Sequence, residues 1–182
     1  MTAVVACVGP HGKTVFGADS LSTIDDGNVR VMAETKIWRS GPYLFGGAGA
    51  GRGIQVARYT FKPPQPKGRD LDHFIGTAFV NALRDAMRES GHMEKKDNAE
   101  KIGSDLLVGV RGSLYLIYEE FDFDRLVEDY AAIGTGALPA LGSLYSTKKM
   151  GATKQRLTLA LSAAEMYDNS VRRPFRFLDS EE

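Results

Sequence analysis

The order of strand-like and helix-like segments is the feature that most limits the fold of this chain. Short runs of small and β-branched residues come first, two helical segments follow, further strands and a second pair of helices come next, and one strand ends the chain. The single-strand, single-helix alternation of a doubly wound fold is absent. Two sheets, each covered by a helix pair, would give every apolar face a surface to pack against. The order therefore predicts an α+β fold, a four-layer α-β-β-α sandwich.

Strands are predicted where β-branched and apolar runs end at turn residues. They cover residues 3–8, 13–19, 29–32, 35–39, 43–45, 105–110, 113–119, 121–128, 129–133 and 173–178. A turn is expected over residues 25–28, and Arg111-Gly112 is expected to close a tight hairpin. Residues 94–101 are highly charged, which favours a solvated surface connector. The acidic end, residues 179–182, is expected to fray.

The clearest helix signal lies over residues 71–87. Apolar side chains there recur at i, i+3, i+4 spacing: Leu71, Phe74, Ile75, Ala78, Phe79, Ala82, Leu83, Ala86 and Met87. We expect Asp70 to cap the start of this helix and Gly91 to mark its end. Further helices are predicted over residues 52–59, 138–146 and 153–168.

Length and charge set broad limits on function. The chain has 182 residues, which suits one domain over residues 1–182. It carries 23 Lys plus Arg and 23 Asp plus Glu, and a net charge of zero argues against nucleic acid or an anionic membrane as a partner and favours self-association. With one cysteine, no apolar run of membrane-spanning length and no signal-peptide pattern, we expect a cytoplasmic location.

Neither a metal nor a cofactor is expected. The three histidines share no ligand spacing with one another or with Cys7, which is expected in the core. The glycine-rich run over residues 46–51 lacks the GxxxxGK[ST] pattern of a phosphate loop. Glycines that let a strand approach a substrate backbone explain that run better.

Thr2 is the candidate nucleophile. A threonine hydroxyl is a poor nucleophile at neutral pH and needs a base within hydrogen-bond reach. An N-terminal threonine carries that base itself, because an α-amine titrates at roughly 7.7–8.0. The mechanism therefore requires Met1 to be removed, and the small side chain of Thr2 makes ordinary methionine removal the expected route.

Six short sequence pieces resemble the proteasome β-subunits and the bacterial proteasome-like peptidase HslV. The pieces are Thr2 at the start of the first strand, GAD ending in Asp19, ETKIW containing Lys36, the run GGAGAG, GTG at residues 134–136, and EMYDNS at the end of the last helix. Their order and spacing cover nearly the whole chain. The resemblance implies the sandwich fold of the N-terminal nucleophile (Ntn) hydrolases.

The resemblance also implies roles for single residues. Lys36 matches the lysine beside the nucleophile, and Asp19 matches the aspartate that pairs with this lysine. Gly49 matches the glycine whose backbone N–H stabilises the oxyanion, and Thr135 matches the hydroxyl residue that supports the terminal amine. Ser22, Gly47 and Ala50 are expected to bind substrate.

The chain departs from the family pattern at several points. Gly53 stands where the family usually has an acid. The late acid and hydroxyl pair has two candidate assignments, Glu165 with Asp168 and Tyr167 with Ser170, and neither reproduces the family pair. As in the bacterial members, no propeptide is expected.

We therefore expect a threonine-type endopeptidase that cleaves peptides or proteins within a self-assembled ring or helical homo-oligomer. The resemblance allows an ATPase unfoldase as a further partner. Two alternatives stay open: a non-catalytic scaffold with the proteasome fold that retains Met1, and an Ntn amidase acting on a small amide.

Overall fold

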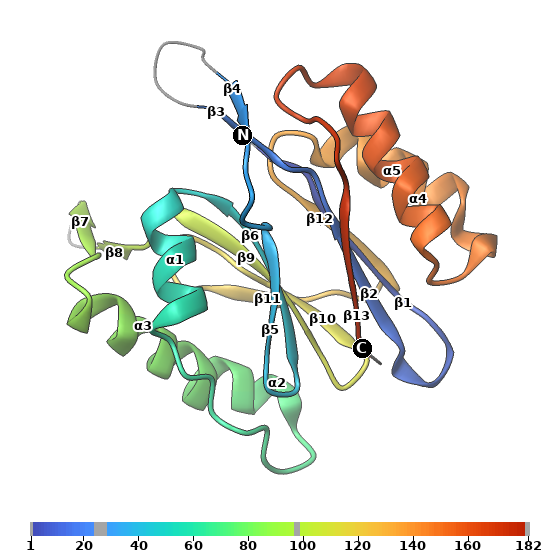
Figure 1. The fold of residues 1–182 in the computed structure, drawn as a ribbon. Coiled ribbons are helices and arrows are strands. Elements are labelled where there is room, and N and C mark those ends of the chain that lie inside the picture. Colours follow the sequence, from blue (N-terminus) through green and yellow to red (C-terminus); the bar gives the residue numbers. More distant parts are fainter. Residues whose placement is uncertain (1, 24–28, 97–98, 181–182) are drawn as a thin grey trace.

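The computed structural model describes residues 2–23, 29–96 and 99–180, and the two main sheets lie face to face in it (Figure 1). The first sheet has the order β12-β1-β2-β13, with bounds β1 Val4–Val8, β2 Thr14–Ala18, β12 Tyr130–Ile133 and β13 Arg176–Asp179. The second has the order β11-β10-β9-β6-β5, with bounds β5 Ile37–Ser40, β6 Tyr43–Gly49, β9 Ser104–Val110, β10 Ser113–Ile117 and β11 Phe123–Arg125. All neighbouring strands in both sheets are antiparallel.

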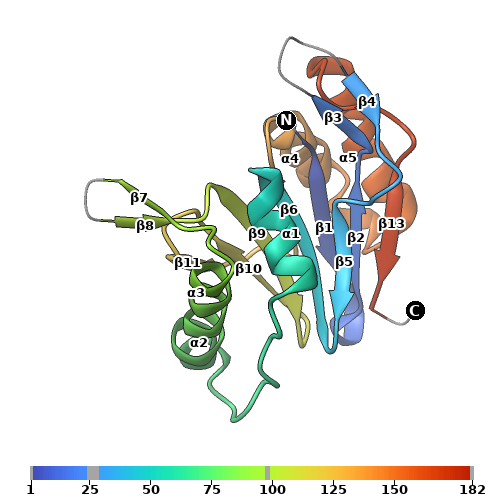
Figure 2. The same cartoon turned by 60° about the vertical axis from the view of Figure 1, so that its left-hand side comes forward.

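Helices cover the outer face of each sheet (Figures 1 and 2). The first sheet carries α4 (Ala137–Ser146) and α5 (Lys154–Tyr167), and the second carries α1 (Gly51–Tyr59), α2 (Leu71–Phe74), the π-helical segment η3 (Ile75–Phe79) and α3 (Val80–Glu89). Short 3-10 turns, η1 (Pro10–Gly12) and η4 (Lys148–Met150), complete the helical segments.

The side chains of β1 explain why the sheets stack. Successive residues of a strand point to opposite faces. Val5 and Cys7 pack in the apolar cluster beneath α4 and α5, whereas Val4 and Ala6 pack in the cluster between the sheets. Both faces of β1 are therefore buried, and the predicted α-β-β-α order of layers is confirmed.

The glycine-rich run is part of a strand. Strand β6 continues to Gly49, whereas the sequence predicted a strand that ended at Phe45. A side chain at Gly46 would place its Cβ 2.4 Å from a methyl carbon of Val4 on the facing sheet. Glycine at this position lets the two sheets approach closely, and the low β-propensity of glycine hid the strand.

Residues 94–101 contain a small antiparallel ribbon, so the prediction of a plain connector was wrong. Its strands are β7 (Glu94–Lys96) and β8 (Ala99–Lys101). Glu100 accepts hydrogen bonds from Arg84 and Arg88 of α3, and Lys101 forms ion pairs with Glu119 and Glu120. The charged side chains of the ribbon therefore bind it to neighbouring elements, in addition to facing solvent.

A second ribbon lies at the end of the sandwich where β1 begins (Figure 2). Its strands are β3 (Leu21–Thr23), which the sequence did not predict, and β4 (Val29–Val31). The turn expected over residues 25–28 lies outside the described residues.

The ends of two elements differ in detail from the prediction. The Asp70 carboxylate accepts a hydrogen bond from the His73 N–H at 2.9 Å, so the expected cap of the long helix is confirmed. Asp179 was expected to fray, but it belongs to β13 and is buried, because β13 pairs with β2. Residues 181–182 lie outside the described part of the chain. No helix in the described ranges is long and apolar enough to cross a membrane.

Candidate active site

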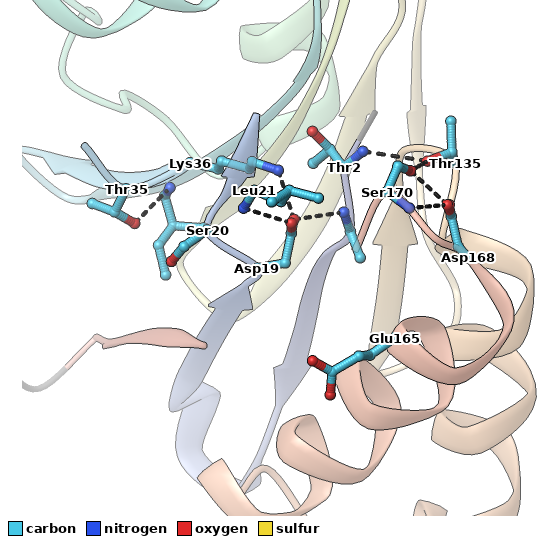
Figure 3. Close-up of polar contacts among 12 residues, drawn as sticks. Thr2, Asp19, Ser20, Leu21, Thr35, Lys36, Thr135, Glu165, Asp168 and Ser170 are labelled. Atoms are coloured by element: carbon cyan, nitrogen blue, oxygen red, sulfur yellow. Dashed lines mark hydrogen bonds and ion pairs between the residues drawn. The ribbon is translucent and has the colours of Figure 1, made fainter. Parts of the chain in front are cut away.

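Antiparallel pairing brings the ends of three strands to one place. Val4 of β1 pairs with Ala18 of β2 and with Ile133 of β12. Thr2 precedes β1, while Asp19 and Thr135 follow β2 and β12, so all three lie at the same end of the first sheet (Figure 3). Lys36 reaches this point from the second sheet, where it directly precedes β5.

Asp19 and Lys36 form a buried ion pair. The Lys36 Nζ lies 2.7 Å from Asp19 Oδ1, and Asp19 is fully buried. Asp19 also accepts backbone hydrogen bonds from Ala3 at 2.9 Å and Leu21 at 3.0 Å. A carboxylate with three donors, one of them charged, is stable without water. Asp19 is thus held rigidly at the start of β1.

The Lys36 ammonium loses its proton more easily than that of a surface lysine. Burial lowers the pKa of Lys36, and the neighbouring charge and hydrogen bond of Asp19 only partly oppose this effect. Figure 3 shows the ammonium between the Asp19 carboxylate and Thr2, and both Thr2 and Lys36 line one cavity. A positive charge at this position favours an alkoxide on Thr2.

A chain of polar groups lies on the other side of Thr2 (Figure 3). The Thr2 backbone N–H donates to Thr135 Oγ1 at 3.3 Å, and Thr135 Oγ1 lies 3.1 Å from Ser170 Oγ. Ser170 donates its hydroxyl and its backbone N–H to Asp168 Oδ1, at 2.5 Å and 2.8 Å. The nitrogen of Thr2 is therefore linked through two hydroxyls to a carboxylate.

The late acid and hydroxyl pair is Asp168 with Ser170. Each of the two assignments that the sequence left open contained one of these residues. Glu165 instead accepts hydrogen bonds from Arg173, and Tyr167 is exposed on the surface. Burial raises the pKa of the Asp168 carboxyl, but hydrogen bonds from Ser170 and Thr135 outweigh burial and leave it below the ordinary value. Asp168 is therefore a carboxylate at neutral pH.

Two cavities flank Thr2, and both also contain Gly49. The first, of about 350 Å³, is further lined by Ala48, Gly103, Ser104, Asp105, Glu119, Gly134 and Thr135. The second, of about 330 Å³, is further lined by Leu21, Ser22, Met32, Glu34, Thr35, Lys36, Gly47, Gly51, Ile54, Gln55 and Arg58. Of the expected substrate-binding residues, Ser22 and Gly47 thus line the second cavity, whereas Ala50 lines neither.

Glycine is required at two positions beside Thr2. Gly49 has φ 120°, and a Cβ there would lie 2.5 Å from the carbonyl oxygen of Gly103. Gly134 has φ 92°, and a Cβ there would lie 2.3 Å from the carbonyl oxygen of Thr2. L-residues with a side chain rarely adopt these angles. Gly134 therefore lets the backbone approach Thr2 closely, and Gly49 lets the end of β6 approach the residues at the start of β9.

Gly53, which departs from the family pattern, is also explained by close packing. A Cβ there would lie 2.7 Å from both the Ile102 carbonyl oxygen and Ser104 Oγ. The Ser104 hydroxyl donates to the Ala50 carbonyl at 2.9 Å, which ties β9 to the start of α1. In this chain a serine hydroxyl occupies the space beside position 53, and an acidic side chain would not fit.

The sequence did not reveal the cavity residues Asp105, Glu119, Glu34 and Arg58. These residues meet through strand pairing, such as Gly49 with Ser104, and through the packing of α1 on β6. Among the described residues, no group of three or more His, Cys, Asp or Glu side chains is arranged to hold a metal ion. Cys7 is buried beneath α4 and α5, where burial raises its pKa to about 12, so it is not a nucleophile at neutral pH.

Comparison with known proteins gives structural matches only. No family model and no curated protein matches the chain. Thiobacillus denitrificans BPH has a TM-score of 0.78 and 18% identity, over 98% of this chain and 97% of that one. Eukaryotic HslV from Trypanosoma brucei has a TM-score of 0.67 and 17% identity, over 98% of each chain.

A third solved structure is the helical assembly of the Anbu complex from Pseudomonas aeruginosa. It has a TM-score of 0.63 and 18% identity, over 98% of this chain and 80% of that one. At such identities the likeness establishes the architecture rather than the activity. The matches extend over almost the whole chain, and the resemblance noted in the sequence is confirmed at the level of fold. The protein has the fold of the proteasome-type Ntn hydrolases.

Proposed function

We propose that the protein is an N-terminal threonine hydrolase that cleaves peptide bonds. The observation that carries this proposal is the convergence on Thr2 of two polar systems. The Lys36–Asp19 ion pair lies on the hydroxyl side, and the chain from Thr135 to Asp168 begins at the nitrogen. Buried charges are costly unless they are paired, so their concentration around one threonine favours a catalytic role.

In the proposed mechanism, removal of Met1 frees the α-amine of Thr2. The amine accepts the hydroxyl proton while Oγ1 forms a bond to the substrate carbonyl carbon. The amine then gives this proton to the departing nitrogen, the C–N bond breaks, and an ester on Thr2 results. Water adds to the ester, the C–Oγ1 bond breaks, and the second product leaves as a carboxylic acid.

The surrounding residues have separate roles in this mechanism. Lys36 stabilises the developing negative charge on Oγ1, and Asp19 positions Lys36. The hydroxyl of Thr135 orients the amine, with Ser170 and Asp168 behind it. The Gly49 N–H is assigned to the oxyanion, a contribution of roughly 100- to 1000-fold in rate for one such donor.

We also propose that the protein acts as a homo-oligomer. Several large apolar side chains of the outer helix layer are exposed: Leu138 and Tyr145 of α4, and Met166 and Tyr167 of α5. Tyr145 also lines an apolar cavity of about 490 Å³, whose wall includes Leu141 of α4 and residues of β10 and β12. Large exposed apolar patches mark interaction surfaces, and the Anbu complex named above is a helical assembly.

The test is hydrolysis of fluorogenic peptides by purified protein from which Met1 has been removed. We expect turnover by the wild type and a loss of at least roughly 1000-fold in Thr2→Ala, by analogy with the removal of other catalytic nucleophiles. Thr2→Ser keeps the hydroxyl and should retain measurable activity. A folded Thr2→Ala protein with wild-type turnover would refute the mechanism.

A panel of small primary amides, measured with the same protein, separates the peptidase from an amidase. Hydrolysis of small amides without any peptide cleavage would replace the proposed substrate class. The absence of all turnover, with Thr2 exposed and the fold intact, would leave the scaffold alternative.

A further inference from the structure

We propose that the cavity lined by Glu34 selects a basic residue, Arg or Lys, on the acyl side of the bond that is cleaved. This inference rests on the proposed function and specifies its substrate class. This cavity has a volume of about 330 Å³ and lies between β6, α1 and the β3–β4 ribbon. It is named the Glu34 cavity below.

The position of the Thr2 nitrogen assigns the two cavities to the two sides of the substrate. This nitrogen faces Thr135, which lines the other cavity, of about 350 Å³. In the proposed mechanism the amine protonates the departing nitrogen, so the leaving half of the substrate lies on the Thr135 side. The Glu34 cavity, across Thr2, therefore receives the acyl half.

The shape of the Glu34 cavity suits a long side chain. Gly47 and Gly51 contribute no side chains to its wall, and Ile54 and Met32 offer apolar surface. Arginine and lysine have apolar stems that pack on such surfaces while the charged end reaches a polar group. Ile54 and Glu34 line the same cavity, so a guest packed on Ile54 shares that space with the Glu34 carboxylate.

The charge that the cavity exposes is negative. Glu34 is 39% exposed, whereas its ion-pair partner Arg58, at 2.8 Å, is only 10% exposed. The other terminal nitrogen of Arg58 donates to the Ile37 carbonyl at 2.8 Å, and its guanidinium carbon lies 5.0 Å from the centre of the Trp38 ring. Arg58 is thus fully engaged behind Glu34.

One oxygen of Glu34 is left for a guest. Oε1 accepts hydrogen bonds from Arg58 and from the Tyr59 hydroxyl. In the described part of the chain Oε2 accepts none. Hydrogen bonds from Tyr59 and Arg58 lower the pKa of Glu34, so its carboxyl is ionised at neutral pH.

Guests of other chemistry fit less well. An acidic side chain would meet the exposed Glu34 carboxylate, and Lys36 is already paired with the fully buried Asp19. An apolar side chain would remove water from Glu34 without replacing its lost hydrogen bonds. A basic head supplies both the opposite charge and the donors.

The experiment compares peptides that differ only in the residue before the cleaved bond: Arg, Leu or Asp. A hydrogen bond to a charged group is worth about 1.5–3 kcal/mol, so we expect the wild type to prefer Arg over Leu by about tenfold or more in kcat/KM. Glu34→Gln keeps an oxygen acceptor for Arg58 but removes the charge, and should bring the ratio of kcat/KM for the Arg peptide to that for the Leu peptide close to one.

Two further variants control for indirect effects. Tyr59→Phe removes a hydrogen bond to Oε1 but keeps the carboxylate, and should retain the Arg preference. Asp85→Asn removes an exposed acid on α3, outside both cavities, and should also retain it. Thermal melts establish that each variant is folded.

The outcomes separate the two proposals. Turnover with no Arg preference, or a preference that survives in Glu34→Gln, overturns the assignment of the Glu34 cavity and leaves the hydrolase intact. If folded protein with Thr2 exposed cleaves none of the three peptides, the proposed peptide hydrolysis is overturned, and this inference with it.

Discussion

Asp19 determines whether Lys36 can remain charged in the interior. It is the only acidic group in an ion pair with Lys36 among the described residues, and it also binds two backbone N–H groups around β1 and β3. Loss of its charge would remove the carboxylate that lies 2.7 Å from a largely buried ammonium. The proposed catalytic role of Asp19 and its structural role are therefore coupled.

Asp19→Asn should lower the free energy of unfolding by about 3–5 kcal/mol, the usual cost of breaking a buried ion pair. It should also abolish peptide hydrolysis. Urea denaturation at pH 7 measures the first effect. Glu120→Gln is the control, because Glu120 forms an exposed ion pair with Lys101 and should change stability by less than about 1 kcal/mol. Equal effects of the two substitutions would contradict the assignment.

Protonation of Asp168 should make the free energy of unfolding depend on pH in the acidic range. Its folded-state pKa lies below the ordinary value of 3.8, so its stabilising contribution is complete above that value and is lost as the pH falls through the folded-state pKa. Asp168→Asn should therefore be less stable than the wild type at pH 7, and the gap should narrow below about pH 4. Urea denaturation at several pH values tests this, and a constant gap would contradict it.

The sequence identified the catalytic candidates at strand ends but not the residues in loops. Thr2 directly precedes a predicted strand, Asp19 is the last residue of another, and Lys36 is the second residue of a third, so strand pairing brings them together. Asp168 and Ser170 follow the end of α5, where the chain leaves the helix. Spacing along the sequence does not fix the direction of such a loop, which is why this pair stayed ambiguous.

At the scale of elements, α5 depends on its first turn. Its N-cap Thr153 accepts a hydrogen bond from the Arg156 N–H at 3.1 Å. Arg156 is fully buried and donates to the Leu144 carbonyl at 2.9 Å, which joins α5 to the end of α4. The start of α5 is therefore fixed both by its own cap and by a hydrogen bond to α4.

Thr153→Ala should destabilise the protein by about 1 kcal/mol, the typical cost of a lost N-cap. The control is Thr158→Ala, which also removes a threonine hydroxyl but in the interior of the same helix. Alanine is the better helix former there, so this substitution should be neutral or slightly stabilising. Thermal or urea unfolding of both variants measures the difference. A destabilisation shared equally by both would contradict a specific capping role.

Elements with regular apolar periodicity were predictable, and elements built on glycine or charge were not. The helix over residues 71–87 follows its i, i+3, i+4 pattern, and in the structure it continues two residues further, to Glu89. The strand through Gly46 and the ribbon β7–β8 have no such pattern. Contact with the facing sheet stabilises the strand, and contact with a neighbouring helix stabilises the ribbon. Tertiary contacts of this kind cannot be read from local sequence.

At the scale of the whole molecule, the exposed apolar side chains of α4 and α5 support the proposal of self-association. Analytical ultracentrifugation should find species well above the 19.8 kDa of one chain. Leu138→Glu combined with Tyr145→Glu should shift the protein toward smaller species, while Arg52→Glu, on the other helix layer, should not. A wild-type monomer at every concentration would contradict this part of the proposal.

The layered architecture also explains the location of the site. One sheet supplies Thr2, Asp19 and Thr135, and the other supplies Lys36 and Gly49, so the site exists only where the two sheets meet. The order of elements predicted the layers, because each apolar face needs a partner. The cavities could not be predicted, because their walls combine segments from both sheets and α1.

The most direct test of the catalytic role of Thr2 is the intact mass of the protein before and after treatment with a peptide epoxyketone such as epoxomicin. BPH has been solved in complex with epoxomicin. An epoxyketone carries two electrophilic carbons, which a free hydroxyl and a free amine on one residue could both attack. We predict that the purified chain lacks Met1 and gains the full mass of one inhibitor molecule, and that Thr2→Ala gains nothing. A chain that retains Met1 and takes up no inhibitor, or an equal adduct on Thr2→Ala, would contradict the account.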